Sequence, residues 1–205
     1  MAIVEVRKLY RVGFCDPAGR KTDAKGPRAR AAIAVIGQDE FERIFLLSIW
    51  ADRLPADKLM EKIFWTHEHF QVAIFGVDAT ATQVIFFDML QKQASDLGIR
   101  IPLRPVDQKM EKTFSIETTL QPIAAGGRLF RPPERECSGL KSEWTTFPNG
   151  FYRDQMDAVT NAIKLLPRVL PEHLRALSRD RLRRYLQSTG MSRDQVELQL
   201  LQKQD

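Results

Sequence analysis

The segment VAIFGVDA, residues 72–79, is apolar at nearly every position and contains an aspartate, Asp78, near its end. A strand with one solvated face would alternate apolar and polar residues, so this pattern indicates a strand that is covered on both faces. Such strands are typical of parallel sheets, in which a helix connects one strand to the next. We therefore expect an α/β sheet with Asp78 at the carboxyl end of an interior strand.

The preceding segment predicts the helix that such a connection requires. In PADKLMEKIFWTHEHF, residues 55–70, apolar side chains recur at helical spacing, for example at Leu59 and Ile63. Pro55 and Asp57 stand where the first turn would begin, and both residue types are favoured there. A helix therefore precedes the buried strand.

Three apolar runs come before this helix. They span residues 9–16, 30–37 and 43–51. The intervening segments PAGRKTDAKGP and QDEFE are rich in turn formers and charged residues, so we predict three consecutive antiparallel strands. Beyond the buried strand, a helical pattern over 82–98 stops at Gly98, a residue type favoured just past a helix end. A short strand is expected next, at 100–107.

This order of elements predicts an α/β fold with a mixed five-stranded sheet, three antiparallel strands followed by two parallel ones, flanked by helices. Further helices are expected over residues 111–125, 138–146 and 152–166, with GGRLF connecting the first two. Pro167 and Pro171 mark a boundary, after which residues 168–184 contain six arginines. We predict one domain over residues 1–166 and a basic helical tail over 167–205.

Aspartates occur at the ends of two predicted strands. Asp16 ends the first strand, in FCDPAG, and Asp78 ends the fourth, in GVDAT. If these strands are neighbours, the two carboxylates emerge side by side, because adjacent strands lie about 4.8 Å apart. Two carboxylates that close need a cation to remain ionised. The carboxyl ends of strands are also where open α/β sheets carry ligands.

The segment FPNGFYRDQMDAV, residues 147–159, supplies two more aspartates. Asp154 and Asp157 stand near the start of a predicted helix and are neighbours at i, i+3 on its surface. Asp157 lies beside the predicted buried stripe that includes Met156 and Val159, whereas Asp154 is a turn nearer the loop. We therefore expect Asp157 to be a fixed ligand and Asp154 a movable one.

These acids predict a metal centre. Oxygen ligands without histidine or cysteine suit Mg²⁺ or Mn²⁺. The expected metal ligands are Asp16, Asp78, Asp154 and Asp157. Two such ions can activate a water and stabilise the leaving oxygen in phosphodiester hydrolysis. Taken singly, each aspartate also has a structural explanation as a turn start, a helix cap or an exposed residue, so the hypothesis depends on their joint arrangement.

The composition narrows the class of partner. Lys and Arg number 31 against 26 Asp and Glu, a formal net charge of +5 that favours anionic partners. No apolar run reaches the roughly 18 to 20 residues needed to cross a bilayer, and the N-terminus lacks the order of a signal peptide. We expect a cytoplasmic protein without a membrane partner. Cys15 and Cys137 fit neither a disulfide framework nor a zinc spacing.

Basic residues follow the first predicted acid. The loop RKTDAKGPRAR contributes Arg20, Lys21, Lys25, Arg28 and Arg30. Lys109 and Lys112 follow the fifth strand. These residues are candidates for DNA binding, because a basic loop beside a metal site can hold the phosphate backbone with salt-dependent, sequence-independent affinity. A solvated hairpin loop and an exposed helix start are the structural alternatives.

Three segments together, VGFCDPAG, FGVDATAT and FPNGFYRDQMDAV, resemble the C-terminal nuclease domain of phage large terminase subunits. The similarity covers roughly residues 11–165. That family is similar in fold to ribonuclease H, so the resemblance implies a ribonuclease H-like sheet. It further implies that Asp16, Asp78 and Asp157 are the catalytic acids, that they bind two Mg²⁺ or Mn²⁺ ions with Asp154 as accessory ligand, and that the substrate is concatemeric double-stranded DNA.

One departure from that family concerns the packaging motor. Large terminases carry an ATPase, yet the phosphate-loop pattern G-x-x-x-x-G-K-[ST] does not occur in this sequence. We therefore expect an excised nuclease domain or a stand-alone nuclease of a phage or prophage, acting in the host cytoplasm. The partners implied by the resemblance are a terminase ATPase motor, a small terminase subunit and a portal.

Two other functions are compatible with the same residues. One is a different nuclease of the ribonuclease H-like group, such as a Holliday-junction resolvase. The other is a non-catalytic module that keeps the fold and docks DNA or a portal within a packaging complex.

Overall fold

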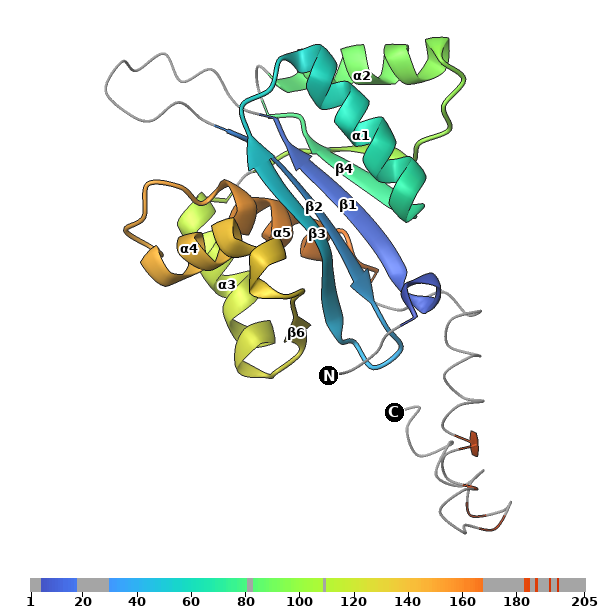
Figure 1. Cartoon of the computed structure of the whole chain (residues 1–205), viewed down its shortest axis with the longest axis vertical. Helices are drawn as coiled ribbons and strands as arrows, with labels where there is room; N and C mark the ends of the chain where they lie inside the picture. The colour runs from blue at the N-terminus through green and yellow to red at the C-terminus, as the bar shows by residue number, and fades with distance from the viewer. Residues whose placement is uncertain are drawn as a thin grey trace.

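The computed structural model describes residues 5–17, 30–80, 83–108 and 110–167, with the single positions 183, 184, 187, 192 and 195. In this part of the chain, six strands form one sheet in the order β5-β4-β1-β2-β3-β6 (Figure 1). The strands are β1 (Tyr10–Asp16), β2 (Ala31–Gln38), β3 (Ile44–Asp52), β4 (Ile74–Asp78), β5 (Leu103–Val106) and β6 (Leu129–Phe130). The helices are α1 (Ala56–Phe70), α2 (Val84–Asp96), α3 (Lys112–Ala125), α4 (Ser138–Thr146) and α5 (Asp154–Lys164), with short 3-10 turns η1 (Val6–Lys8) and η3 (Glu134–Glu136).

The pairing of the strands confirms the predicted mixed sheet. β1 pairs with β2 and β2 with β3, both antiparallel, whereas β4 pairs parallel with β1 and β5 parallel with β4. The helix between β3 and β4 is the crossover that a parallel neighbour requires. The prediction of five strands was one short, because Leu129 and Phe130, expected in a connection, form a sixth strand parallel to β3.

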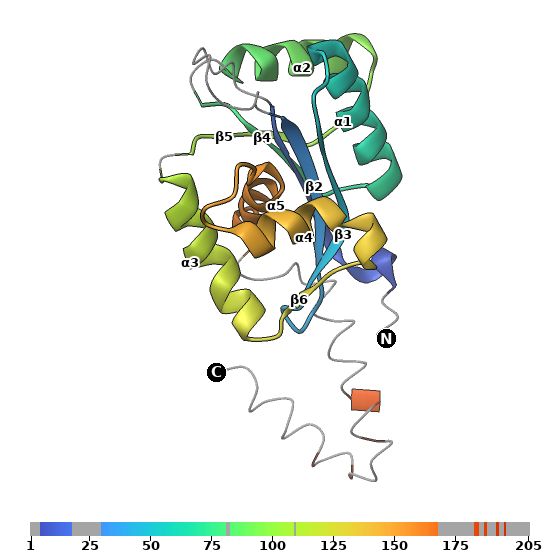
Figure 2. The same ribbon diagram turned by 60° about the vertical axis from the view of Figure 1, so that its left-hand side comes forward.

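The sheet is covered on both faces. Helices α1 and α2 pack on one face and α3, α4 and α5 on the other, as the two views agree (Figures 1 and 2). Successive residues of β1 alternate between the two layers: Phe14 belongs to the core beneath α5, and Cys15 to the core beneath α1. This double coverage explains why the interior strands are apolar without alternation.

Glycines allow the two central strands to approach closely. In the register of β1 and β4, Gly13 is paired with Phe75, and Phe14 with Gly76. A Cβ atom on Gly13 would lie 2.8 Å from the Phe75 ring, and one on Gly76 would lie 2.8 Å from the Phe14 ring. Each glycine therefore leaves room for the aromatic side chain on the neighbouring strand.

Helix α5 is buried deeply against β1 and β2. Every residue from Gln155 to Ile163 is buried, and Asp157 has 0% exposure. Met156 and Val159 form the predicted apolar stripe of this helix. The expectation that Asp157 stands at the helix edge beside Asp154 is wrong, because the carboxylate of Asp157 lies inside the protein, where it needs a partner.

Three further predictions concern the end of α2, membrane-spanning helices and the C-terminal tail. Gly98 has φ +67° after α2, and Gly98 and Ile99 donate to Ser95 and Ala94, as expected of a helix end. Within the described residues, no helix has the length and apolar character needed to cross a membrane. The predicted tail at 167–205 lies almost entirely outside the described residues, so the domain boundary stays a prediction.

Candidate active site

Two of the predicted acids meet at one edge of the sheet. Because β1 and β4 are parallel neighbours in which Cys15 pairs with Val77, Asp16 and Asp78 both follow at the carboxyl ends of their strands. Asp16 is 5% exposed and Asp78 is 4% exposed. After burial and Asp157, the charge on Asp78 also contributes to raising the pKa of Asp16.

The third acid, Asp157 on α5, is connected to Asp16 by the side chain of Lys112. Lys112 Nζ, at the start of α3, lies 2.8 Å from Asp16 Oδ2 and donates a hydrogen bond to it. The same nitrogen lies 2.7 Å from Asp157 Oδ2 in an ion pair. One ammonium therefore bridges the carboxylates of β1 and α5.

Polar neighbours orient each carboxylate. Asp78 Oδ1 accepts from the Thr80 amide at 2.9 Å and the Thr80 hydroxyl at 2.6 Å, and Gln108 Nε2 donates to Oδ2 at 2.9 Å. Asn161 Nδ2 donates to Asp157 Oδ1 at 3.1 Å. Gln83 Nε2 donates to Asp16 Oδ1 at 3.4 Å. All three acids are thus held in defined orientations.

Burial governs the protonation of this site. Burial raises the pKa of Asp16 to about 7, with Asp157 and Asp78 adding to the rise and Lys112 opposing it. Burial alone would lower the pKa of Lys112, but the carboxylates of Asp16 and Asp157 outweigh it and raise that pKa. Burial also raises the pKa of the Cys15 thiol well above its ordinary value, with the charges on Asp16 and Asp78 contributing. The site therefore holds excess negative charge that favours a bound cation.

The carboxylate oxygens of this site are ligands that suit a divalent metal ion. In this structure, however, they are paired with other side chains of the protein. In the ranges that the structure describes, no group of three or more His, Cys, Asp or Glu side chains is placed to hold a metal ion. The oxygens face Lys112, Thr80, Gln108 and Asn161 instead. The Lys112 ammonium is a cation placed between two buried carboxylates, so the charge balance fits a metal ion although Lys112 would have to withdraw.

The structure places Asp154 in a different set of contacts. Asp154 Oδ2 accepts from Arg30 Nε at 3.1 Å, and Arg30 Nη2 also donates to Glu143 Oε1 at 2.7 Å. The Arg30 guanidinium stacks on the Tyr152 ring, 3.9 Å from its centroid. Asp16, Asp78 and Asp157 are brought together, whereas Asp154 lies in a separate group of contacts. The role of all four aspartates as metal ligands stays a prediction.

The predicted DNA-binding residues divide into two groups. Arg30 and Lys112 are described, and both pair with acids. The other candidates, Arg20, Lys21, Lys25, Arg28 and Lys109, lie outside the described residues. Their role in DNA binding stays a prediction.

Several contacts of this site were missed from the sequence. Thr80, two residues after Asp78, and Asn161, one helical turn after Asp157, stand at spacings where such hydrogen bonds are common, so their signal was present. Lys112 was assigned to DNA, although its place just after the edge strand β5 puts it near the ends of β4 and β1. Glu143 carried no local signal, because its partners lie on other elements.

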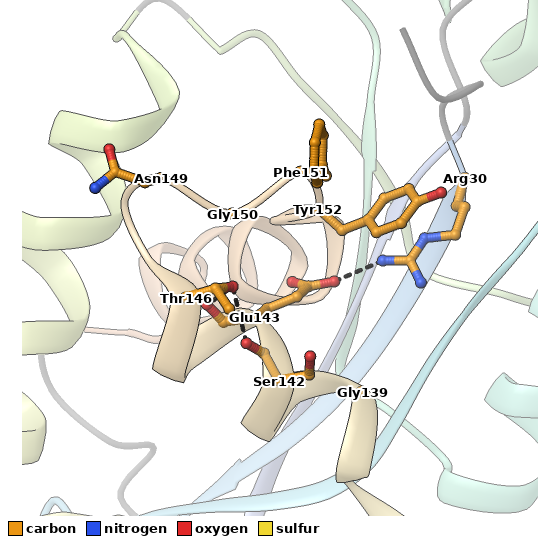
Figure 3. Close-up of a pocket in the computed structure, with 9 residues that line it drawn as sticks. All are labelled: Arg30, Gly139, Ser142, Glu143, Thr146, Asn149, Gly150, Phe151 and Tyr152. Atoms are coloured by element: carbon orange, nitrogen blue, oxygen red, sulfur yellow. Dashed lines mark hydrogen bonds and ion pairs between the residues drawn. The ribbon is translucent and has the colours of Figure 1, made fainter.

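An open pocket of about 790 Å³ borders the Arg30 contacts. Helix α4 lines one side of it, with Ser142, Glu143 and Thr146, and the loop with Gly150 and Tyr152 lines the other. Figure 3 shows Arg30 beside the Tyr152 ring and reaching Glu143 across the pocket. The first turn of α5 is therefore next to a solvent-accessible hollow.

Comparisons with known proteins bear on the fold. The sequence matches no protein-family model, and it matches no curated protein. Among solved structures, the large terminase nuclease of thermophilic phage G20c, with bound zinc, aligns over 69% of this chain and 77% of its own, at TM-score 0.53 and 12% identity. The HK97 bacteriophage large terminase aligns over 77% of this chain and 40% of its own, at TM-score 0.53 and 13% identity.

The two terminase structures align with most of this chain. At 12% and 13% identity, these alignments show the fold alone. The mixed sheet and the helix crossover into β4 were predicted from the sequence, whereas the packing of α5 against β1 and β2 was not. The chain therefore has the ribonuclease H-like fold of phage large terminase nuclease domains.

Proposed function

We propose that this chain is a metal-dependent endonuclease domain of the phage or prophage large terminase type, which cuts concatemeric double-stranded DNA during genome packaging. The observation that carries the proposal is the convergence of Asp16, Asp78 and Asp157, all at most 5% exposed, on one edge of this fold. Burying three carboxylates close together is energetically costly unless a cation neutralises their charge. A structural role alone would not require that cost.

Each acid has a defined part in this proposal. Asp16, Asp78 and Asp157 would hold two Mg²⁺ or Mn²⁺ ions, which when bound supply activation of a water and stabilisation of the leaving oxygen. Thr80 and Gln108 orient the Asp78 carboxylate. Lys112 neutralises Asp16 and Asp157 in the state described here, so the site is stable before a metal ion arrives.

The basic residues near the acids are the proposed DNA-binding residues. Arg20, Lys21, Lys25, Arg28 and Lys109 would hold the phosphate backbone beside the acids. Arg30 and Lys112 would join them only after release from their carboxylates. The wider partners that we propose are a terminase ATPase motor, a small terminase subunit and a portal, in the cytoplasm of the host cell.

The test is cleavage of supercoiled plasmid by the purified chain with Mn²⁺ or Mg²⁺. We expect nicked and linear products from the parent, and a loss of at least about 100-fold in rate for Asp16→Asn, Asp78→Asn and Asp157→Asn, because each removes a metal ligand. Asp88→Asn is the matched control, since Asp88 is exposed on α2. An inactive parent, or full activity in Asp16→Asn, would exclude the proposed mechanism.

The bridging of Asp16 and Asp157 by Lys112 favours one second candidate, a docking module without catalysis. In such a module the lysine would remain between the acids and no metal ion would bind. Titration calorimetry with Mn²⁺ separates the two functions, because the docking module would show no binding while retaining affinity for DNA. Comparing a plasmid with a four-way junction in the cleavage assay separates a terminase-type nuclease from a resolvase.

A further inference from the structure

Helix α5 begins without a cap of its own. Its N-cap residue, Arg153, makes no side-chain capping hydrogen bond. The first turn is nevertheless buried, with Gln155 at 7% exposure and Met156 at 3%. Backbone N–H groups in a buried first turn need an acceptor, because a buried donor left unpaired loses its hydrogen bonds to water without replacement.

A carboxylate from another helix satisfies these donors. Glu143, on α4, is 4% exposed, and its Oε2 accepts from the amides of Gln155 at 2.9 Å and Met156 at 3.0 Å. The negative charge also lies at the helix N-terminus, where the helix dipole favours it. Glu143 is therefore an N-terminal cap supplied across a helix pair.

The second oxygen of Glu143 connects this cap to the sheet. Glu143 Oε1 accepts from Arg30 Nη2 at 2.7 Å, and Arg30 immediately precedes β2. In the register of β1 and β2, Asp16 is paired with Ala32, two residues beyond Arg30. One end of this contact network thus lies two residues from Ala32, the strand partner of Asp16, and the other lies at Met156, next to Asp157 in the chain.

We propose that Glu143 is a positioning residue of the acid site. It fixes the first turn of α5 and so sets where the Asp157 carboxylate stands relative to Asp16, while Arg30 ties that turn to the start of β2. This inference rests on the proposed metal-dependent function. The new element is that metal affinity depends on Glu143, although none of its described hydrogen bonds is to Asp16, Asp78 or Asp157.

The arrangement explains why a cap from α4 matters more than a local one. A side chain from within the loop would satisfy the amides but would not connect the first turn of α5 to α4 or to the start of β2. Glu143 instead joins α4, α5 and the start of β2 through three hydrogen bonds. Because the pocket opens beside Glu143, its replacement by a smaller or isosteric side chain causes no steric overlap.

The test compares the full-length parent with Glu143→Ala, Glu143→Gln and the matched control Glu134→Gln, which alters an exposed ion pair with Lys141. In the metal-free proteins, amide hydrogen exchange by NMR reports directly on the Gln155 and Met156 N–H groups. We expect exchange at least about tenfold faster in Glu143→Ala. Glu143→Gln keeps a carbonyl acceptor for these groups, so we expect it to restore most of the protection.

The second readout is Mn²⁺ affinity by calorimetry, with plasmid cleavage measured in parallel. We expect about tenfold weaker Mn²⁺ binding in Glu143→Ala, a fall in kcat with little change in KM for DNA, and partial rescue by Glu143→Gln, whose single oxygen caps the amides but whose Nε2 cannot accept from Arg30. Glu134→Gln should match the parent. The positioning role is overturned if the parent binds Mn²⁺ and cuts DNA and Glu143→Ala does both equally well, even with faster amide exchange. A parent that does neither overturns the nuclease proposal itself, and with it this role.

Discussion

Lys112 Nζ lies 2.8 Å from Asp16 Oδ2, although the two residues are 96 positions apart in the chain. The same ammonium reaches Asp157 at 2.7 Å, so the first residue of α3 neutralises acids from β1 and α5. A cation is thereby present between the carboxylates before any metal ion binds. The relationship makes Lys112 a competitor of the proposed metal ion as well as a stabiliser of the metal-free protein.

Replacement of Lys112 by methionine separates these two effects. Lys112→Met keeps an unbranched side chain, one atom shorter, but leaves Asp16 and Asp157 without their cation. We expect the metal-free protein to lose about 1 to 3 kcal/mol, less than for a fully buried pair, because the lysine side chain is 43% exposed. Mn²⁺ should then raise the melting temperature more than it does in the parent.

Thermal denaturation with and without Mn²⁺ measures both quantities. Lys141→Met is the control, because Lys141 forms an exposed ion pair with Glu134 and is expected to contribute less than about 1 kcal/mol. Equal melting temperatures and equal Mn²⁺ shifts in Lys112→Met and the parent would contradict the competition.

The raised pKa of Asp16 predicts a pH dependence of stability. Its pKa is about 7 in the folded protein, mainly because of burial, against an ordinary value of 3.8. Between these values the folded state binds more protons than the unfolded state, so the contribution of Asp16 is fully present below about pH 4 and is lost as pH rises through 7. Because Mn²⁺ binds the ionised form, it should raise the melting temperature more at pH 8 than at pH 5.5.

Differential scanning calorimetry at the two pH values checks this dependence. In Asp16→Asn, which cannot ionise, the difference between the Mn²⁺ shifts at pH 8 and pH 5.5 should shrink. A Mn²⁺ shift that is larger at pH 5.5 than at pH 8 in the parent would show that the assignment of Asp16 is wrong.

Gly76 is expected to be intolerant of even one methyl group. A Cβ atom there would lie 2.8 Å from the Phe14 ring and would also overlap Leu165, which follows α5. We expect Gly76→Ala to lower the free energy of unfolding by about 1 to 3 kcal/mol in urea denaturation. Gly98→Ala is the contrast, since its Cβ has open space and only its φ of +67° opposes substitution, at a cost of about 1 kcal/mol. A Gly76→Ala protein as stable as the parent would contradict the close approach of the strands.

Asn161 is expected to support Asp157 directly. Its Nδ2 donates to Asp157 Oδ1 at 3.1 Å, and its side chain is 2% exposed. Asn161→Leu should weaken Mn²⁺ binding several-fold, because the Asp157 carboxylate would lose a donor that orients it. The neighbouring Thr160→Val removes a buried hydroxyl that bonds only to the Met156 carbonyl among the described contacts, so it should leave Mn²⁺ affinity unchanged. Equal calorimetric affinities in both variants would count against an orienting role.

Most secondary structure could be predicted from the sequence, because its signals are local. The run at 72–79 and the helical spacing over 55–70 gave β4 and α1 with boundaries within two residues. Strand β6 was missed because two residues carry no periodicity, and only the edge of β3 makes Leu129 and Phe130 a strand. Such short pairings depend on the neighbouring element rather than on the residues themselves.

In the candidate site, too, some features follow from local sequence patterns and others only from the packing of distant elements. Asp16 and Asp78 end apolar strands, so their positions at strand ends could be predicted from the sequence, and the parallel pairing of β1 with β4 then brings them to one edge of the sheet. The partners of Asp154 and Asp157 depend on how α5 packs against the start of β2 and against α3, which no local pattern records. Sequence alone therefore determined the order of the elements and the acids at their ends. Only the tertiary structure decided that Lys112 pairs with Asp157 and Arg30 with Asp154, because these contacts join residues whose proximity arises from packing across the sheet.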